Sequence, residues 1–371
     1  MSEWHSEDAE HMRHALGLAA LGLNTTDPNP RVGCVLVRDG RVVGEGWHER
    51  AGGPHAEVCA LQSVGDSARG ATAYVTLEPC AAQGRTPPCT QALLAAGVRR
   101  VVYAASDPHP RMQGGAAQLQ QAGVEVVGGL LANEARELNI GFFSRFERQR
   151  PWVRVKLGAS LDGRTALANG ASRWITGKQA RADAQLYRAR SSVVLTGIGT
   201  VLADDPALNV RLDGASRQPL RVVLDSALRA PVAARMFNRE GPALILVSSA
   251  LADLAARGAP YAEHGVRVEA VAPAASGGLD LSAVLARLAA LEANEVWVEA
   301  GAQLAGALLA QQLVDELVLY LAPCLLGPGA LPLAQLPELA DLDQRVALQY
   351  HEVTRVGDDL RIVLRPRHQG S

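Results

Sequence analysis

A histidine and a glutamate stand two residues apart in the stretch GGPHAEVCAL, residues 52–61, where they could bind a metal and move a proton. His55 follows a glycine-proline turn, and Glu57 lies at the start of an apolar run with helical spacing. Taken alone, the pair has an ordinary structural explanation, because an acidic residue is favoured near a helix N-terminus. A chemical role therefore requires further ligands elsewhere in the chain.

Two cysteines supply such ligands in the stretch LEPCAAQGRTPPCTQALL, residues 77–94. Cys80 follows a predicted buried strand, and Cys89 begins the next predicted helix, where a thiolate is stabilised. One histidine and two thiolates leave the fourth tetrahedral position of Zn²⁺ open for water, as catalytic sites require. Glu57, close to the metal without binding it, would shuttle the proton of that water. The order H-x-E, P-C and a second Cys is the signature of zinc nucleobase deaminases.

The other cysteines and the composition limit the class of protein. Cys34, Cys59 and Cys324 lie in apolar strand or helix contexts or at a strand end, and we expect them to be core or bystander residues. Five scattered cysteines do not suggest a disulfide framework and suit a reducing compartment. The charged N-terminus lacks the apolar segment of a signal peptide, and no membrane-length apolar run follows. We therefore expect a soluble cytoplasmic protein.

The charge balance favours a small-molecule substrate. The chain has 36 basic and 38 acidic residues, and so lacks the broad basic surface of proteins that bind duplex DNA or RNA. Its aromatic content of 4% provides few platforms on which single-stranded bases could stack. No nucleic-acid partner is expected.

The elements that must position these residues alternate between helices and strands. Residues 8–21 have helical spacing, and residues 32–47 predict two strands that join at Asp39-Gly40. The predicted helix after His55 is followed by a buried strand, the cysteine-bearing loop and two helix-to-strand steps. A closing helix is predicted over residues 131–150. This alternation predicts a layered α/β domain that ends near the charged RFERQRP segment.

A second alternating series of strands and helices begins after Pro151. With 371 residues, the chain exceeds the usual size of one core, so we predict two α/β domains, residues 1–148 and 149–371. In the second domain, one strand leads to Gly197-x-Gly199 and then to a predicted polar loop. Gly301 lies between a strand and a helix N-terminus, where a pyrophosphate could bind.

Several motifs together resemble the bifunctional deaminase-reductases of riboflavin biosynthesis. In the first domain these are PNPRVGCVLV before HAE, the segment GRTPPC, and the eight residues between the two cysteines. In the second domain they are KLGASLDGRTAL and SRWIT, so the resemblance covers nearly the whole chain. It implies an N-terminal cytidine-deaminase-like α/β/α domain that binds Zn²⁺ and a C-terminal dihydrofolate-reductase-like α/β domain that binds NADPH.

The resemblance also implies two consecutive reactions on a pyrimidine ribotide. The first domain would hydrolytically deaminate 2,5-diamino-6-ribosylamino-4(3H)-pyrimidinone 5′-phosphate, and the second would reduce the ribosyl side chain to give 5-amino-6-(5-phosphoribitylamino)uracil. The implied residues of the first site are His55, Cys80 and Cys89 as zinc ligands, Glu57 as proton donor and acceptor, Asn29 and His48 at the ring, and Arg85 at the phosphate. Members of the family usually carry a His between the cysteines, where this chain has Ala82 and Gln83. That substrate contact is therefore expected to differ.

In the second domain the resemblance implies separate cofactor and substrate contacts. NADPH would contact Gly158, Trp174, Thr200, Asp204, Ser226 and Gly301, and the substrate would contact Ser172, Arg188, Leu208, Arg211 and Glu299. The two arginines suit a ribose phosphate, because a guanidinium can bind two phosphate oxygens at once. Asp204 is also the acid–base candidate, and ADDP equally fits a turn with a helix cap. Ser226 with Arg229 is the expected site of the 2′-phosphate, and Lys156 is a further functional candidate.

Two other functions stay open at this point. A nucleic-acid-editing zinc deaminase with an accessory α/β domain would share HAE and PC, but the near-neutral charge, the long cysteine spacing and the second domain oppose it. A zinc-stabilised binding module would have no use for Glu57 and would close its metal site with a fourth protein ligand. A homodimer through the second domain is expected from the resemblance alone.

Overall fold

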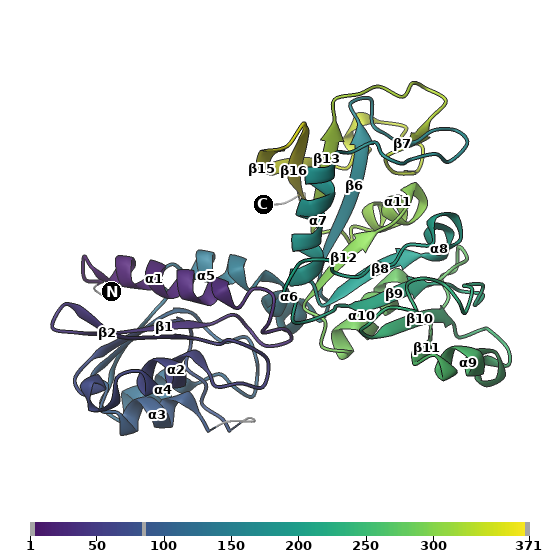
Figure 1. Cartoon of the computed structure of the whole chain (residues 1–371). Coiled ribbons are helices and arrows are strands. Elements are labelled where there is room, and N and C mark those ends of the chain that lie inside the picture. Colours follow the sequence, from purple (N-terminus) through teal and green to yellow (C-terminus); the bar gives the residue numbers. More distant parts are fainter. Residues whose placement is uncertain (1–3, 84–86, 368–371) are drawn as a thin grey trace. The chain divides into compact units, whose positions relative to one another are not determined.

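The structure is a computed structural model that describes residues 4–83 and 87–367 (Figure 1). The chain divides into two compact units, residues 1–149 and 150–371. This division falls one residue after the boundary predicted from the sequence. Within the described residues, no helix is long and apolar enough to cross a membrane.

The first unit contains a five-stranded sheet in the order β2-β1-β3-β4-β5. Its strands are β1 (Gly33–Arg38), β2 (Arg41–Trp47), β3 (Thr72–Leu77), β4 (Arg100–Ala105) and β5 (Glu125–Gly128). β1 is antiparallel to β2 and β3, whereas β3, β4 and β5 are parallel. The predicted hairpin is confirmed: Asp39 and Gly40 both have positive φ, 51° and 71°, which a tight two-residue turn requires. Because β3 and β4 are neighbouring parallel strands, their carboxyl ends lie at the same edge of the sheet.

Helices cover both faces of this sheet, as Figure 1 shows. On one face lie α1 (Asp8–Leu21) and α5 (Ala132–Leu138), and on the other lie α2 (Ala56–Gln62), α3 (Cys89–Ala95) and α4 (Gly115–Gln121). A Cβ on Gly46 would lie 2.4 Å from the backbone nitrogen of Ala60 in α2, and one on Gly115 would lie 1.7 Å from the carbonyl oxygen of Pro79. Only glycine permits these approaches, which bring α2 and the start of α4 close to the strands.

The closing helix predicted over residues 131–150 is wrong as a single helix. α5 ends at Leu138, and α6 (Ile140–Arg148) begins after a break at Asn139. The Asn139 side chain accepts a hydrogen bond from the backbone N–H of Arg31 (2.8 Å) and donates one to its carbonyl (2.9 Å). The break therefore serves a contact to a segment 108 residues away, which helical periodicity alone does not reveal.

The second unit contains a nine-stranded sheet in the order β11-β10-β9-β8-β12-β6-β13-β16-β15. Its strands are β6 (Trp152–Ser160), β8 (Val193–Gly197), β9 (Leu220–Leu224), β10 (Ala243–Ser248), β11 (Val266–Val271), β12 (Glu295–Glu299), β13 (Glu316–Ala322), β15 (Leu348–Val356) and β16 (Asp359–Pro366). The strands from β11 to β13 in this order are parallel, and β16 and β15 add an antiparallel edge. A two-stranded sheet pairs β7 (Arg164–Ala166) with β14 (Leu331–Pro332).

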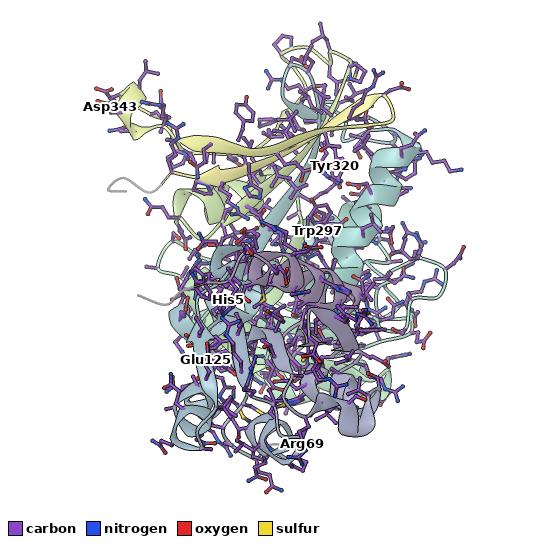
Figure 2. All side chains as sticks on the ribbon, turned by 90° about the vertical axis from the view of Figure 1, so that its left-hand side faces the viewer. His5, Arg69, Glu125, Trp297, Tyr320 and Asp343 are labelled. Atoms are coloured by element: carbon purple, nitrogen blue, oxygen red, sulfur yellow. The ribbon has the colours of Figure 1, made fainter. Side chains whose placement is uncertain are left out.

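Two layers of helices enclose the parallel part of this sheet. One core cluster joins the sheet to α10 (Leu281–Ala290) and α11 (Ala302–Ala310). The other joins the opposite face to α7 (Lys178–Arg190), α8 (Ile198–Asp204) and α9 (Leu254–Glu263). Trp297 and Tyr320, labelled in Figure 2, are buried on this second face. Tyr187 of α7 stacks on Trp297 with ring centroids 4.7 Å apart, and the Tyr320 hydroxyl donates to Asp183 of α7 (2.6 Å). These contacts fix the helix that carries Arg188.

Several parts of the second unit differ from the sequence prediction, among them α9 (Leu254–Glu263), which was not predicted. The polar loop predicted after Gly197-x-Gly199 is wrong, because α8 starts at Ile198 and buries Ile198 and Val201 in the core. The hairpin of β15 and β16 was not predicted. Most residues of β15 are exposed, so the strand lacks the alternation of buried and exposed positions that marks a half-buried strand.

Candidate active sites

The predicted zinc ligands meet at one point of the first unit. Among the described residues, His55, Cys80 and Cys89 form a group of three potential ligands whose donor atoms all lie within 4.8 Å of one another. His55 Nδ1 is 3.1 Å from Cys89 Sγ and 3.6 Å from Cys80 Sγ. Ligands at about 2.1 Å (N) and 2.3 Å (S) around a tetrahedral ion lie roughly 3.5 Å apart, so the donor set fits Zn²⁺.

The local structure accounts for this convergence. His55 is the residue before α2, Cys80 follows the end of β3 by three residues, and Cys89 is the first residue of α3. The backbone N–H of Cys89, at the start of α3, donates to Cys80 Sγ (3.2 Å). A helix N-terminus stabilises a nearby thiolate, and here it faces Cys80. The hydrogen bond between the two thiols lowers the pKa of Cys80 and raises that of Cys89, so the pair readily holds one thiolate. A hydrogen bond to Cys80 raises the pKa of His55.

Glu57 lies beside this group in the first turn of α2 and is 3% exposed. Burial raises the pKa of its carboxyl group, although the charge of His55 opposes that shift. A carboxyl group with a raised pKa is a stronger base when ionised, so it can accept a proton and then donate it again. This is the property that a proton shuttle requires.

Asn29 and His48 form a second polar pair in the first unit. His48 is 3% exposed, and its Nδ1 lies 2.8 Å from the carbonyl oxygen of Pro54, so Nδ1 carries the hydrogen. Nε2 is then the acceptor for the Asn29 side-chain amide at 3.1 Å. The His48 ring meets the His55 ring edge-on, with centroids 5.7 Å apart. Burial lowers the pKa of His48, which keeps this neutral tautomer. The structure therefore brings both predicted ring contacts to the zinc group.

The segment between the two cysteines is described only in part. Ala82 is half-buried and Gln83 is exposed. Arg85, the predicted phosphate partner, lies outside the described residues.

Two acidic residues at the same sheet edge were not predicted from the sequence. Glu78 follows β3 and accepts hydrogen bonds from the backbone N–H groups of Asp107 (3.3 Å), Gly114 (3.1 Å) and Ala116 (3.0 Å). Asp107 follows β4, and burial raises its pKa to about 7, with further contributions from Glu78 and Cys80. Their position immediately after two buried strands could have revealed them. Glu78 holds the loop that carries Asp107 next to the zinc group.

In the second unit, the predicted residues gather along the carboxyl ends of the parallel strands. Gly158 and Lys156 lie on β6, Glu299 ends β12, and Ser226 follows the end of β9. Ligands of open α/β sheets bind at this edge. Burial lowers the pKa of Lys156, and Glu299 partly opposes that shift.

Glu299 and Arg188 form the best-defined pair of this edge. Arg188 donates from Nε and Nη2 to the Glu299 carboxylate (2.5 and 2.8 Å), and from Nη1 to the carbonyl of Asn209 (2.8 Å). Burial alone would raise the pKa of Glu299, but the charge and hydrogen bonds of Arg188, the Lys156 charge and the Trp297 hydrogen bond together outweigh burial and lower it to about 2. Trp297 Nε1 also donates to Glu299 (2.8 Å). The fork predicted for a phosphate is thus made with a carboxylate in this structure.

Leu208 and Arg211 lie on the loop that Arg188 contacts through Asn209. Leu208 is 1% exposed and has a φ of 51°. The backbone N–H of Arg211 donates to the Gln185 side chain (3.0 Å), and its guanidinium is exposed. Arg211 is therefore better placed than Arg188 to accept an anionic ligand.

Ser172, Trp174 and Asp204 lie at the surface of the same edge. Trp174 is 68% exposed, and the Arg181 guanidinium lies 4.2 Å from its ring centroid. Asp204 ends α8, and its carbonyl accepts a hydrogen bond from Arg173 (3.1 Å). Ser172 is half-buried in the same segment.

The glycine-containing junctions fit a dinucleotide. Gly197 and Gly301 are the residues before α8 and α11, and Thr200 lies in the first turn of α8. A Cβ on Gly199 or Gly301 would meet no atom within 4 Å, so both turns are open. The nine-residue helix α11 presents its positive end there, which suits a pyrophosphate.

Comparison with known proteins covers both units. Residues 5–105 match the cytidine and deoxycytidylate deaminase zinc-binding region, and residues 151–362 match the RibD C-terminal domain. The chain is 48% identical over 367 residues to the riboflavin biosynthesis protein RibD of Escherichia coli (strain K12), covering 95% of this chain and 98% of that protein. The chain belongs to the RibD family of riboflavin biosynthesis proteins. RibD of Haemophilus influenzae is 45% identical over 381 residues, covering 99% of this chain and all of that protein.

Solved RibD structures share the whole architecture. The structure of Acinetobacter baumannii RibD, form 1, has a TM-score of 0.90 and 41% identity, with 98% of this chain and 99% of that one covered. A Thermotoga maritima diaminohydroxyphosphoribosylaminopyrimidine deaminase/5-amino-6-(5-phosphoribosylamino)uracil reductase has a TM-score of 0.85 and 32% identity, covering 97% and 99%. The predicted fold class, the joined deaminase and reductase, and the use of Zn²⁺ and NADPH are confirmed for this RibD family member. The roles of single residues stay predictions.

Proposed function

We propose that this chain catalyses two consecutive steps of riboflavin biosynthesis. Residues 1–148 deaminate 2,5-diamino-6-ribosylamino-4(3H)-pyrimidinone 5′-phosphate. Residues 149–371 then reduce the ribosyl side chain of the deaminated product to give 5-amino-6-(5-phosphoribitylamino)uracil. The observation that carries the proposal is the three-ligand group of His55, Cys80 and Cys89 beside the buried Glu57, in one chain with a RibD C-terminal domain. The Thermotoga maritima protein of the same architecture is named for both activities.

In the deamination, Glu57 is the group that moves the proton. His55, Cys80 and Cys89 would hold a zinc ion, which would supply a water of lowered pKa as nucleophile. Glu57 accepts a proton from this water at its carboxylate and delivers it to the departing amino group, so that water is consumed and ammonia is released. Asn29 and His48 orient the ring, because their hydrogen bond and the Pro54 carbonyl fix the imidazole and the amide.

In the reduction, the second unit positions a substrate and a cofactor at one sheet edge. NADPH, when bound, would supply the hydride, and Asp204 donates the proton that completes the addition of two hydrogens to the sugar. Arg211 binds the 5′-phosphate, and Arg188 holds Glu299 against the substrate. Gly158, Trp174, Thr200 and Gly301 line the nicotinamide cofactor, and Ser226 with Arg229 takes its 2′-phosphate.

The remaining parts of the proposal concern where and with what the enzyme works. Its partner is the small-molecule ribotide and no nucleic acid, in keeping with the near-neutral charge. We infer a cytoplasmic enzyme, because two free thiols are required at the zinc group and the five cysteines are unpaired. A homodimer through the second unit is inferred from the family.

The test supplies the diaminopyrimidine ribotide to the zinc-loaded full chain, with and without NADPH, and follows the products by mass spectrometry. We expect replacement of one amino group by oxygen without NADPH, and gain of two hydrogens only when NADPH is present. Unchanged ribotide under both conditions would contradict the proposal. Deamination of cytidine in an oligonucleotide, tested in parallel, would favour the editing function instead.

A further inference from the structure

The loop of residues 205–211, which carries Leu208 and Arg211, is held from two sides. On one side α7 binds it through Arg188 and the Asn209 carbonyl (2.8 Å) and through Gln185 and the Arg211 N–H (3.0 Å). On the other side the Asp205 carboxylate accepts the backbone N–H of Arg235 (2.7 Å). The segment of residues 231–240 therefore lies directly against the loop that carries Arg211.

This segment carries two exposed arginines, Arg235 and Arg239. Among the described residues, no carboxylate forms an ion pair with either of them or with Arg211. Surface arginines are commonly solvated, but three uncompensated guanidinium groups from adjoining segments repel one another unless an anion neutralises them. The Arg235 Nη1 also donates to the Asp205 carbonyl (3.5 Å), so its guanidinium faces the loop that carries Arg211.

A buried arginine strengthens this positive potential. Arg221 of β9 is 1% exposed, and its Nη2 donates to the carbonyls of Arg239 (2.9 Å) and Gly241 (2.5 Å). Its Nε and Nη1 have no hydrogen-bond partner among the residues that the structure describes. The guanidinium of Arg221 therefore fixes the backbone at Arg239 and adds a buried positive charge that pairs with no carboxylate in the described part of the chain.

The charges of these residues act on one another. Burial lowers the pKa of Arg211, and the positive charges of Arg188, Arg235 and Arg239 lower it further, while Glu299 opposes them. Because the carboxylate of Glu299 is engaged by Arg188, it does not neutralise the exposed arginines. A bound anion would remove the repulsion.

We propose that Arg235 and Arg239 are further binding residues of the reductase site, which together with Arg211 form a three-arginine rim for a phosphate monoester. The inference rests on the proposed function and deepens it, because it adds recognition residues to the reductase half. Two such groups are present in the reaction, the 5′-phosphate of the ribotide and the 2′-phosphate of NADPH. The rim is assigned to the ribotide, because the segment of Arg235 contacts the loop that carries Leu208 and Arg211. Arg229, proposed for the 2′-phosphate of NADPH, is a separate arginine whose Nε lies 3.7 Å from the Asp225 carboxylate.

The test measures steady-state reduction by full-length Arg235→Gln, Arg239→Gln and doubly substituted enzymes. Each single change should raise KM for the deaminated ribotide about three- to tenfold and the double change more, with kcat and KM for NADPH nearly unchanged. The KM of the wild type should rise with ionic strength, and that of the double variant should rise less. Arg267→Gln is the matched control, because Arg267 is a half-exposed arginine of the same unit that pairs with Glu269 (3.6 Å). Arg239→Lys keeps the positive charge, so its KM for the deaminated ribotide should stay close to that of the wild type.

Three outcomes decide the inference. An increase in KM for NADPH without an increase for the ribotide would overturn the assignment to the substrate phosphate, and unchanged KM values for both would overturn the rim altogether. Equal penalties on the ribotide and its dephosphorylated form would also overturn it. Calorimetric binding of ribose 5-phosphate to the full chain separates the inference from the proposed function. Weaker binding by the double variant would support the rim even if the wild type reduced no ribotide, and equal binding would contradict the rim.

Discussion

The two active sites of this chain are built in different ways. The zinc group and Glu57 lie within residues 55–89, and each of these residues stands near a strand end or a helix start of one small sheet. The reductase site is spread from Lys156 to Gly301 and uses open glycine turns and paired charges along the carboxyl ends of several strands. A metal site depends on a few ligands, and no other side chain can replace one that is lost. A dinucleotide site distributes its binding energy over many contacts. Single changes should therefore abolish the first activity and only weaken the second.

The largest effect is expected for Cys80→Ser. Loss of one thiolate should release the zinc and abolish deamination, because three protein ligands are the minimum of this open site. Reduction of the deaminated ribotide should continue, since the reductase residues lie in the other unit. Metal analysis and the two separate assays measure this. Cys59→Ser, which changes a thiol of α2 outside the ligand group, should behave like the wild type. Loss of both activities would contradict the independence of the sites.

Glu57→Gln should lower the deamination rate at least ~10²-fold while the zinc stays bound, because an amide cannot shuttle a proton. Zinc content and ammonia release are the two readouts. Glu49→Gln, an exposed change close in sequence, is the control. Normal turnover by the Glu57→Gln enzyme would remove Glu57 from the mechanism, and loss of zinc from that enzyme would make Glu57 a structural residue.

Arg211→Ala should raise KM for the phosphorylated substrate of the reductase about ten- to a hundredfold, with NADPH affinity nearly unchanged. The same substrate without its phosphate makes the comparison sharp. With the dephosphorylated compound, the KM of the wild type should rise toward that of the variant, whereas the KM of the variant should hardly change. An equal loss on both compounds would mean that Arg211 supports the fold or the cofactor.

The smallest effect concerns stability, and it tests whether the two units unfold separately. Asp8 is 1% exposed and pairs with Arg100 (2.9 Å); burial raises its pKa, but hydrogen bonds from Arg100 and Tyr74 outweigh burial and lower it to about 2. A lowered pKa stabilises the fold above the unfolded value near pH 4, and this contribution is lost as the pH falls from about 4 to 2. Asp8→Asn should therefore destabilise the first unit by about 2 kcal/mol at pH 7.

Calorimetry of the full chain provides the measurement. The unfolding temperature of the first unit should fall and that of the second should stay unchanged. The difference in unfolding temperature between the variant and the wild type should vanish near pH 2. Asp39→Asn, in the exposed hairpin turn, is the control, because asparagine tolerates the same positive φ. A shift of both transitions would show that the units unfold together.

Much of the fold followed from local patterns. The hairpin at Asp39-Gly40, the strands around the two cysteines and the glycine before α11 are confirmed, because turn residues and apolar periodicity act over a few residues. The errors have long-range causes. The closing helix is interrupted at Asn139, whose side chain binds the backbone of Arg31. β15 was not predicted because most of its residues are exposed, so it lacks the alternation of buried and exposed positions.

The zinc chemistry of this protein follows from its local sequence. His, Cys and Glu at strand-to-helix junctions have few other uses in combination, so residue type and order were sufficient to predict the site. The pairing of charged residues, in contrast, depends on the tertiary structure. It pairs Arg188 with Glu299, 111 residues away, and places Glu78 under the loop of Asp107. Charged residues are common on every surface, and the order of strands in a sheet depends on packing across the whole unit. Their partners are therefore fixed by the fold and by no local signal.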